Sequence, residues 1–290
     1  MWPLERQTDL VRVGRERVEY WASSAQGLVL RGECAVAYTE GTQGAVLAAG
    51  LARLFQRVKG HAGVRRQGKT KIDMVFESAC LPIMLIKAGH SLWSRKPLEA
   101  LLRHRFSQLY NDRDDPVAAW HLQLDHRPGD AHGLGYGFMP TTREAAVGAT
   151  LAAGLRLASL QSAFSWGWQR LQRHRRKLIG GAIGRGGWWL WIEQERALVC
   201  HFDACDRLQS MNAGAVVPEC AAECLRLIEI EALRQGIPSE GTGMAVVGWQ
   251  QASNGFRGES GNRLAFVTVA GDGVIRPLGV AEPGCAGVGA

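Results

Sequence analysis

The chain has 290 residues, of which 46% are hydrophobic and 21% charged, and it carries a net charge of +7 with an isoelectric point near 9.2. This is the composition of a globular protein with a sizeable core, which excludes a mainly disordered chain or a single small module. The positive balance favours an anionic neighbour: nucleic acid, an acidic membrane surface or an acidic partner. No run of residues approaches the ~18 apolar positions of a membrane span.

Cysteine usage points to the cytosol. Seven cysteines are an odd number, and the first residues, 1–6, do not form a secretory leader. We therefore expect a cytoplasmic protein whose only possible membrane association is peripheral, at the inner membrane.

The first half of the chain mixes strand-like runs with amphipathic helices. Runs at 10–13, 18–21 and 34–38 read as strands, and a helix follows, because apolar residues repeat at the spacing of one buried face at Leu47, Leu51, Leu54, Phe55 and Val58. A basic, glycine-bearing loop spans 59–69. Residues 72–76 and 80–86 are then expected to form a hairpin joined through Glu77 and Ser78.

The next elements are a helix at 95–110 and strands at 120–124 and 133–138. A further helix comes next in the chain, and a strand follows it. Thr141 and Glu144 have the spacing of a capping box that opens this helix, and Gly154 closes it. A further helix from Ser162 runs into a basic segment. The glycine-rich stretch 180–187 then suggests a boundary between lobes.

The second half reads as β-β-β-α-β. It has strands at 188–192, 197–202 and 207–211, a helix at 218–235 and a strand at 244–247, with one more strand at 264–269. We expect an N-terminal lobe over 1–178, a C-terminal lobe over 179–270 and a flexible tail over 271–290. The pattern at 72–110 is echoed at 188–235.

From Lys71 to Trp249 this order resembles the actin-like PilM and GspL group of type IV pilus and type II secretion inner-membrane platforms. The segments that carry the resemblance are 75–82 (VFESACLP), 155–161 (LRLASLQ) and 189–193 (WLWIE). It implies an α/β, actin-like fold with two ribonuclease-H-like subdomains of mixed sheet flanked by helices. It also implies a partner, because in that group the cytoplasmic tail of a bitopic inner-membrane protein lies in a cleft of the actin-like lobe.

The chain departs from the ATP-binding members of the actin-like class. Those proteins place an Asp-x-Gly turn in the first hairpin of each lobe, where the carboxylate holds the metal ion and the glycine lets amides approach phosphate. No Asp-x-Gly occurs in this sequence. Its expected hairpin corners are Glu77-Ser78-Ala79 and 193–196 (EQER), so a degenerate, nucleotide-free relative is the better interpretation.

One phosphate-loop pattern is present. Residues 63–70 (GVRRQGKT) match G-x-x-x-x-G-K-T, with Gly63, Gly68, Lys69 and Thr70 at the defining positions. A working loop of this kind follows a strand and opens a helix, whereas here a helix precedes it and a strand-like run follows. A basic connecting loop is the alternative, and we prefer it.

The remaining motifs have ordinary structural explanations. Zinc could be held by Cys200, His201, Cys205, Cys220 and Cys224, but their spacing favours buried thiols. The tryptophans 166 and 168 precede the basic segment 170–177, as in nucleic-acid sites, yet they also fit the inner face of a helix. Trp188, Trp189 and Trp191 read as core, and an exposed one would belong to a docking surface.

The sequence therefore favours a non-enzymatic cytoplasmic scaffold that docks an inner-membrane partner in a pilus or secretion-like envelope assembly. We identify no catalytic residue, metal site or cofactor. The alternatives are a P-loop ATPase using Gly63–Thr70 and a basic nucleic-acid-binding protein, with nucleic acid the less favoured partner.

Overall fold

The structure is a computed structural model that describes residues 8–24, 27–37, 43–59, 70–87, 95–110, 116–126, 132–169, 186–193, 196–205, 207–214, 221–237, 244–249, 264–269 and 275–277. The chain divides into two compact units, Met1–Arg170 with Gly271–Gly273 and Leu171–Ala270 with Val274–Ala290. The expected boundary near 178 lies outside the described residues. No helix among the described residues is long and apolar enough to span a membrane.

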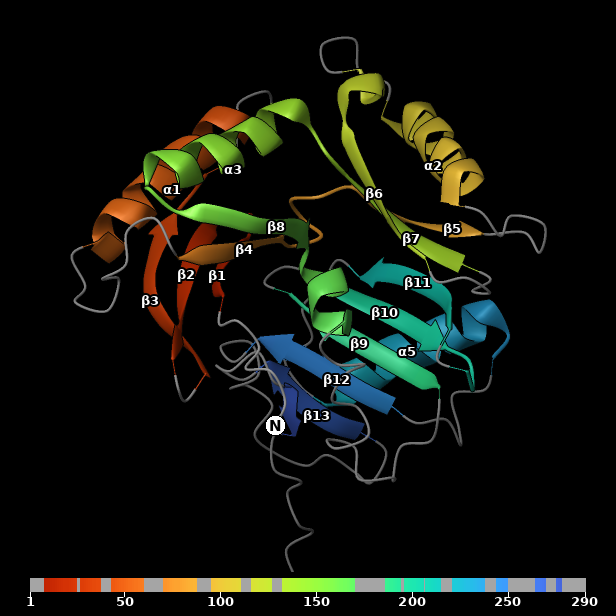
Figure 1. The fold of residues 1–290 in the computed structure, drawn as a ribbon. Coiled ribbons are helices and arrows are strands. Elements are labelled where there is room, and N and C mark those ends of the chain that lie inside the picture. Colours follow the sequence, from red (N-terminus) through yellow and green to blue (C-terminus); the bar gives the residue numbers. More distant parts are fainter. Residues whose placement is uncertain are drawn as a thin grey trace, which may run out of the picture. The chain divides into compact units, whose positions relative to one another are not determined.

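The first unit is built on a five-stranded mixed sheet. Its strands are β1 (Asp9–Val13), β2 (Arg17–Ser24), β3 (Gly27–Ala35), β4 (Lys71–Phe76) and β8 (Arg156–Ser162). They lie in the order β3-β2-β1-β4-β8 (Figure 1). The first three strands are antiparallel neighbours, whereas β4 pairs parallel to both β1 and β8.

Two helices, α1 (Gln43–Lys59) and α3 (Pro140–Ala152), lie side by side over one face of this sheet (Figure 1). The buried face of α1 consists of the five expected apolar residues together with Gly50. One of them, Phe55, packs edge-on against Tyr20 of β2. The amphipathic spacing of the sequence therefore identified this helix correctly.

The ends of α3 match the sequence in part. Gly154 has φ of +72° and its amide bonds the Leu151 carbonyl, while the Leu155 amide bonds that of Thr150. This is the Schellman arrangement that a glycine after a helix favours, as expected. The capping box was wrong: Met139 is the N-cap and Pro140 begins the helix, so Thr141 lies inside it.

A second, three-stranded sheet is inserted between β4 and α3. It consists of β5 (Ile83–Lys87), β6 (His121–Asp125) and β7 (His132–Phe138), in the order β5-β7-β6, with α2 (Arg95–Leu109) and the short 3-10 helix η1 (Val117–Ala119) beside it. Leu98, Leu102 and Phe106 of α2 pack on one face of the sheet. Glycines of β7 allow this close approach, since a Cβ on Gly135 would lie 2.1 Å from Leu102 Cδ1.

The expected hairpin of 72–76 and 80–86 was therefore wrong. β4 joins the five-stranded sheet, and β5 pairs with β7 in the other sheet. Glu77 and Ser78 have turn-like composition, but the chain uses the segment after them to cross from one sheet to the other. A short polar break between two strand-like runs does not determine whether the runs pair with each other.

The second unit has a six-stranded sheet of order β11-β10-β9-β12-β13-β14. Its elements are β9 (Gly187–Ile192), β10 (Ala197–Phe202), β11 (Leu208–Gly214), α5 (Ala221–Gln235), β12 (Met244–Trp249), β13 (Leu264–Val269) and β14 (Ile275–Pro277). Side chains of α5, including Cys224 and Ile228, pack against Trp188, Leu190 and Val199. The last strand, β14, lies inside the expected tail.

The two units share one plan. Each begins with three antiparallel strands and a helix, and then adds strands parallel to the first, so that β3-β2-β1-β4-β8 corresponds to β11-β10-β9-β12-β13. The internal echo is therefore between 9–76 and 187–249, not between 72–110 and 188–235 as the sequence suggested. The expected α/β class, with mixed sheets flanked by helices, is confirmed.

Candidate functional site

The first hairpin of each unit turns in the same way. The Gly14 amide bonds the Arg17 carbonyl at 2.9 Å between β1 and β2, and the Glu193 amide bonds the Arg196 carbonyl at 2.8 Å between β9 and β10. The corner at Glu193 was predicted correctly. The corner of the first unit was not, because it is Gly14–Arg17 and not Glu77-Ser78-Ala79.

Arg12, two residues before Gly14, is the centre of a buried ion cluster. Its exposed fraction is 1%, and those of Glu19 and Glu77 are both 0%. Arg12 Nε donates to Glu77 Oε1 at 2.7 Å, and Nη2 donates to the same oxygen. Arg12 Nη1 donates to Glu19 Oε2 at 3.2 Å. The guanidinium thus ties β1 to β2 and to the residue that follows β4.

One further hydrogen bond and one ion pair hold Glu19 in this cluster. Trp21 Nε1 donates to Glu19 Oε2 at 3.1 Å, and Arg17 Nε lies 3.0 Å from Glu19 Oε1. The Arg12-Val13-Gly14 segment therefore has the spacing of an Asp-x-Gly turn with a cation where the acid would stand. Both nearby carboxylates are engaged by arginine, which leaves the cluster suited to a structural role.

A second polar group lies on the same face of the sheet, opposite α1 and α3. Asp73 of β4 accepts hydrogen bonds from Ser159 Oγ at 2.6 Å and from Thr8 Oγ1 at 2.9 Å. Gln161 Nε2 donates to Ser159 Oγ. These bonds satisfy the carboxylate within the sheet, so Asp73 helps to hold β8 beside β4.

Two of the strand edges of the first unit are capped by side chains. Along β3, every second residue forms its main-chain hydrogen bonds with β2, and Val36, just after β3, continues this series, because its amide donates to the Glu16 carbonyl. The carbonyls of Glu33 and Ala35 therefore point away from β2. Arg57 Nη1 donates to the Glu33 carbonyl at 2.9 Å and Arg53 Nη2 to that of Ala35 at 3.3 Å. On β8, Gln123 Nε2 donates to the Leu160 carbonyl at 3.0 Å.

The outer edge of β5 differs. The Gly137 amide donates to the Pro82 carbonyl. Because hydrogen-bonded residues alternate along an antiparallel pair, Met84 and Ile86 are the residues of β5 whose main-chain groups bond to β7. The main-chain groups of Ile83, Leu85 and Lys87 therefore point away from β7. They have no hydrogen-bond partner among the described residues. The side chains of Ile83 and Leu85 are half-buried, and that of Lys87 is exposed. This is a short apolar edge of the kind that accepts another strand.

Titratable groups gather on the face of the small sheet opposite α2. Burial raises the pKa of Asp125, against the opposing effects of a hydrogen bond from Ser165 and the charge of Arg95. Burial and the charge of Asp125 also raise the pKa of Tyr136, whose hydroxyl donates to Gln123 Oε1 at 2.8 Å. Both shifts favour the neutral form of the group, as burial does for an acid or a phenol.

The phosphate-loop pattern lies almost entirely outside the described residues. Gly63, Gly68 and Lys69 are not described, and Thr70 immediately precedes β4, where its carbonyl accepts the Arg156 amide at 3.1 Å. The neighbouring elements are helix α1, which ends at Lys59, and strand β4. A phosphate-binding loop requires the reverse order. That these residues form a basic connecting loop stays a prediction.

The cysteines of the zinc hypothesis are not brought together where they are described. Cys224 packs on α5 against the sheet face that carries Val199, and Cys200 is the next residue of β10, so its side chain points to the opposite face. Cys205 is exposed, and Cys220 is not described. The described residues include no group of three or more His, Cys, Asp or Glu arranged to hold a metal ion.

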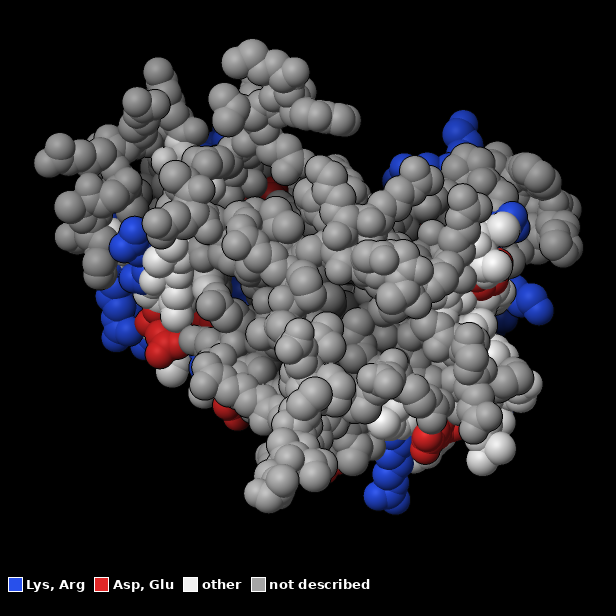
Figure 2. Space-filling view, turned by 90° about the horizontal axis from the view of Figure 1, so that it is seen from below, with Lys and Arg blue, Asp and Glu red and all other residues white. Residues whose placement is uncertain are grey.

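The aromatic and basic segments give no exposed platform in the described part of the chain. Trp188, Trp189 and Trp191 are all buried, as is Trp166, while 170–177 lie outside the described residues. Figure 2 shows one face of the molecule, on which the described lysines and arginines form separate small groups, several of them beside acidic side chains.

No family model and no curated protein matches the chain, but solved structures do. A Bacteroides thetaiotaomicron protein of unknown function with an actin-like ATPase fold is 10% identical, with a TM-score of 0.53 over 84% of this chain and 82% of that one. A structure described as the PilM-PilN type IV pilus biogenesis complex gives 13% identity and a TM-score of 0.50, over 88% and 84%. The cytoplasmic domain of EpsL, an inner-membrane component of the Vibrio cholerae type II secretion system, gives 11% and 0.44, over 83% and 81%.

These similarities define the class of protein: the chain has an actin-like fold, as the sequence predicted. The similarity to the PilM-PilN complex is one of fold. Sequence reasoning missed Arg12 and the β5 edge. Arg12 could have been found, because Arg12-Val13-Gly14 has the Asp-x-Gly spacing at the end of a strand-like run. The edge could not have been found, because it depends on which strands pair.

Proposed function

We propose that this protein is a non-enzymatic cytoplasmic scaffold that docks the cytoplasmic tail of a bitopic inner-membrane protein in a pilus or secretion-like envelope assembly. The observation that carries the proposal is the outer edge of β5. An extended tail can bond to its outward main-chain groups while side chains of the tail contact Ile83 and Leu85. The similarity to a PilM-PilN complex supports this choice of partner.

Among the edges of β3, β8 and β5, the edge of β5 is the best suited to this role. Arg53 and Arg57 occupy the outward carbonyls of β3, and Gln123 occupies one of β8. Lys87, at the end of β5, places a positive charge where an acidic residue of the tail would meet it. A charge on an edge strand also discourages pairing with unrelated strands, so Lys87 favours selective docking.

The ion cluster supports a scaffold over an ATPase. A nucleotide site of this fold class needs a free carboxylate for its metal ion at the first hairpin, and this chain has Arg12 at that place, paired with Glu19 and Glu77. Converting the cluster to metal binding would require a buried arginine to release both acids. Such a change is costly, because an unpaired buried charge is strongly destabilising.

The test is titration of the full chain with synthetic tails of the bitopic inner-membrane proteins encoded beside its gene. We expect one tail to bind and Leu85→Pro to raise its Kd by about tenfold or more, because a lost main-chain hydrogen bond costs about 0.5–1.5 kcal/mol and the ring obstructs its neighbours. Proline fits this position, since the Leu85 amide points outward and the inner ladder does not use it.

The matched control is Glu33→Pro on β3. Its amide also points outward, but the edge it belongs to is capped by Arg57, so tail binding should not change. Hydrogen exchange should show protection of 83–87 on binding. If no tail binds, or if Leu85→Pro and Glu33→Pro behave alike, docking at β5 is refuted. ATP hydrolysis that Lys69→Ala abolishes would favour the P-loop ATPase instead.

A further inference from the structure

Lys87 and His132 form a cross-strand pair at the end of the β5 edge. Lys87 is the last residue of β5 and His132 is the first of β7, and the two lie directly opposite each other. They exchange no main-chain hydrogen bonds, because Met84 and Ile86 are the residues of β5 that bond to β7, and side chains are closest in pairs of this kind. Both side chains lie on the face opposite α2, since Ile86 faces α2.

The surroundings of His132 favour its neutral imidazole. The Nδ1 atom is buried and has no hydrogen-bond partner in the described part of the chain. Burial lowers the pKa of His132, and the positive charge of Lys87 lowers it further. Lys87 forms no ion pair among the described residues, so its full charge acts on the ring. Of the two causes, only the charge of Lys87 can be changed by a ligand at the β5 edge.

The other titratable groups described on this face do not offset the charge of Lys87. Asp125 of β6 lies diagonal to His132, and burial raises its pKa, while Ser165 and Arg95 approach it. Tyr136, four residues along β7, also has a pKa raised by burial. Burial and Lys87 are the two causes of the lower pKa of His132, so the cross-strand lysine is the charge that controls this ring.

The groups on the other face are separated from the pair by the sheet. A Cβ placed on Gly133 would lie 3.2 Å from His126 Cβ, and Gly133 is opposite Ile86, so His126 lies on the α2 face. The charged residues of α2 belong to that face as well. The Lys87 and His132 pair is therefore an isolated cation beside a histidine.

We propose that Lys87 selects a tail with a carboxylate opposite it, and that His132 takes up a proton when this tail docks. The inference rests on the proposed function, because it concerns the same edge. The main-chain groups of Lys87 point outward, so the tail residue that bonds to them turns its side chain to the face of Lys87 and His132. A carboxylate there pairs with the Lys87 ammonium, and the lysine then opposes the imidazolium less.

Docking and protonation are then linked with a definite sign. The docked carboxylate raises the pKa of His132, so the complex binds more protons than the free chain does. Linkage is reciprocal, and protonation must therefore tighten docking by the same factor by which docking favours the proton. The Kd should fall as the pH is lowered from about 8 to about 6, a range in which a tail carboxylate, with an ordinary pKa of about 4, stays ionised.

The experiment is calorimetric titration of the full chain with the synthetic tail that binds in the test of the proposed function. We expect a Kd about fivefold lower at pH 6 than at pH 8. The dependence should disappear when the acidic residue of the tail is replaced by its amide. His132→Gln should also remove it, whereas His121→Gln, on β6 of the same sheet, should keep it.

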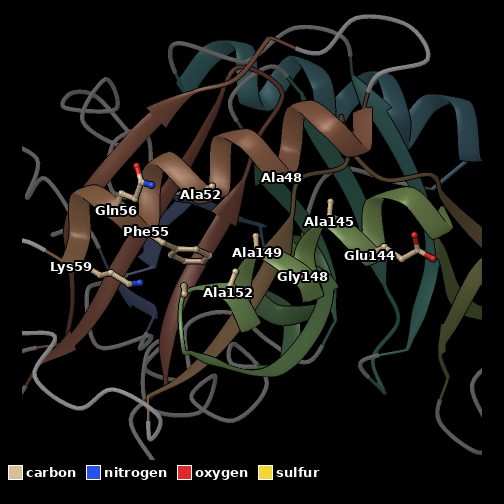
Figure 3. Close-up of a pocket in the computed structure, with 11 residues that line it drawn as sticks. Ala48, Ala52, Phe55, Gln56, Lys59, Glu144, Ala145, Gly148, Ala149 and Ala152 are labelled. Atoms are coloured by element: carbon tan, nitrogen blue, oxygen red, sulfur yellow. The ribbon is translucent and has the colours of Figure 1, made fainter.

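Lys59 is the matched control for the charge of Lys87. It lines an open groove of about 410 Å³ between α1 and α3 (Figure 3), and the described residues that line this groove include no histidine. Lys87→Gln should weaken docking and reduce its pH dependence. Lys59→Gln changes the net charge equally but should leave both unchanged.

A measurement without the tail separates this inference from the proposed function. In NMR titrations of the free chain, Lys87→Gln should raise the pKa of His132 and leave that of His121 unchanged, because Arg143 is the charge that acts on His121. An unchanged pKa of His132, or tail binding whose pH dependence is absent or survives His132→Gln, overturns this inference alone. If no tail binds at either pH, the proposed function is refuted together with it.

Discussion

Arg12 Nε donates a hydrogen bond of 2.7 Å to Glu77 Oε1 and so connects the end of β1 to the residue that follows β4. Two acids share this buried guanidinium. Arg12→Ala should therefore lower the free energy of unfolding by about 3–5 kcal/mol, because it leaves both acids buried without their cation. Arg17→Ala, a partly exposed partner of the same Glu19, should cost less than about 1 kcal/mol. Denaturant titration compares them, and equal losses would contradict the central role of Arg12.

Nucleotide should not stabilise the protein. At a hundred times its Kd a ligand adds about 2.7 kcal/mol to stability, which a thermal melt detects readily. We expect ATP and magnesium to leave the melting temperature of the wild-type protein unchanged. Lys69→Ala should likewise melt at the same temperature with and without the nucleotide. A rise in the melting temperature that Lys69→Ala removes would instead identify residues 63–70 as a working phosphate loop.

The cysteines should behave as a core without metal. A structural zinc site makes folding depend on metal, whereas here a chelator should leave the melting temperature unchanged. In native protein, Cys205 should react with a thiol reagent before Cys200, since Cys205 is exposed while burial, aided by the charge of Glu231, raises the pKa of the Cys200 thiol. One zinc per chain by metal analysis would refute this account.

Asp125 should make stability depend on pH. Burial raises its pKa in the folded chain, so the folded state holds the proton more tightly than the unfolded state, whose pKa is about 3.9. The stabilisation is fully present below that value and is lost as the pH rises through the folded pKa. Asp125→Asn should thus be more stable than wild type at pH 7, with the difference vanishing in acid. A constant difference in denaturant titrations across that range would exclude this titration.

Glycines of β7 and α3 should respond in opposite ways. Gly135→Ala would put a Cβ 2.1 Å from Leu102 Cδ1 in the core under α2, and overpacking of this kind costs about 1–3 kcal/mol. Gly148→Ala meets open space on a helix and should add about 0.5–1 kcal/mol. Thermal melts of the two variants test whether α2 packs directly on the β7 backbone.

The sequence predicted elements better than it predicted their pairing. Apolar spacing located α1, α2 and α5, and the strands at 187–192 and 197–202 were nearly correct, because these patterns are local. Pairing is not local: β4 was assigned to a hairpin with β5, yet it lies between β1 and β8. The ion cluster depends on that pairing, since it forms only when Arg12 and Glu77, 65 positions apart, share a sheet.

The position of β4 within its sheet has a consequence during synthesis. Its neighbour β8 ends at Ser162, about 85 residues after β4 ends, and chains grow at about 5–20 residues per second. For several seconds β4 is consequently the outermost strand of a nascent domain. Asp73 lies near its middle, and the groups that later bond it from β8 do not yet exist. A charged residue at that place disfavours pairing of β4 with strands of other nascent chains. The Asp73 carboxylate thus reduces association during synthesis and afterwards accepts a hydrogen bond from β8.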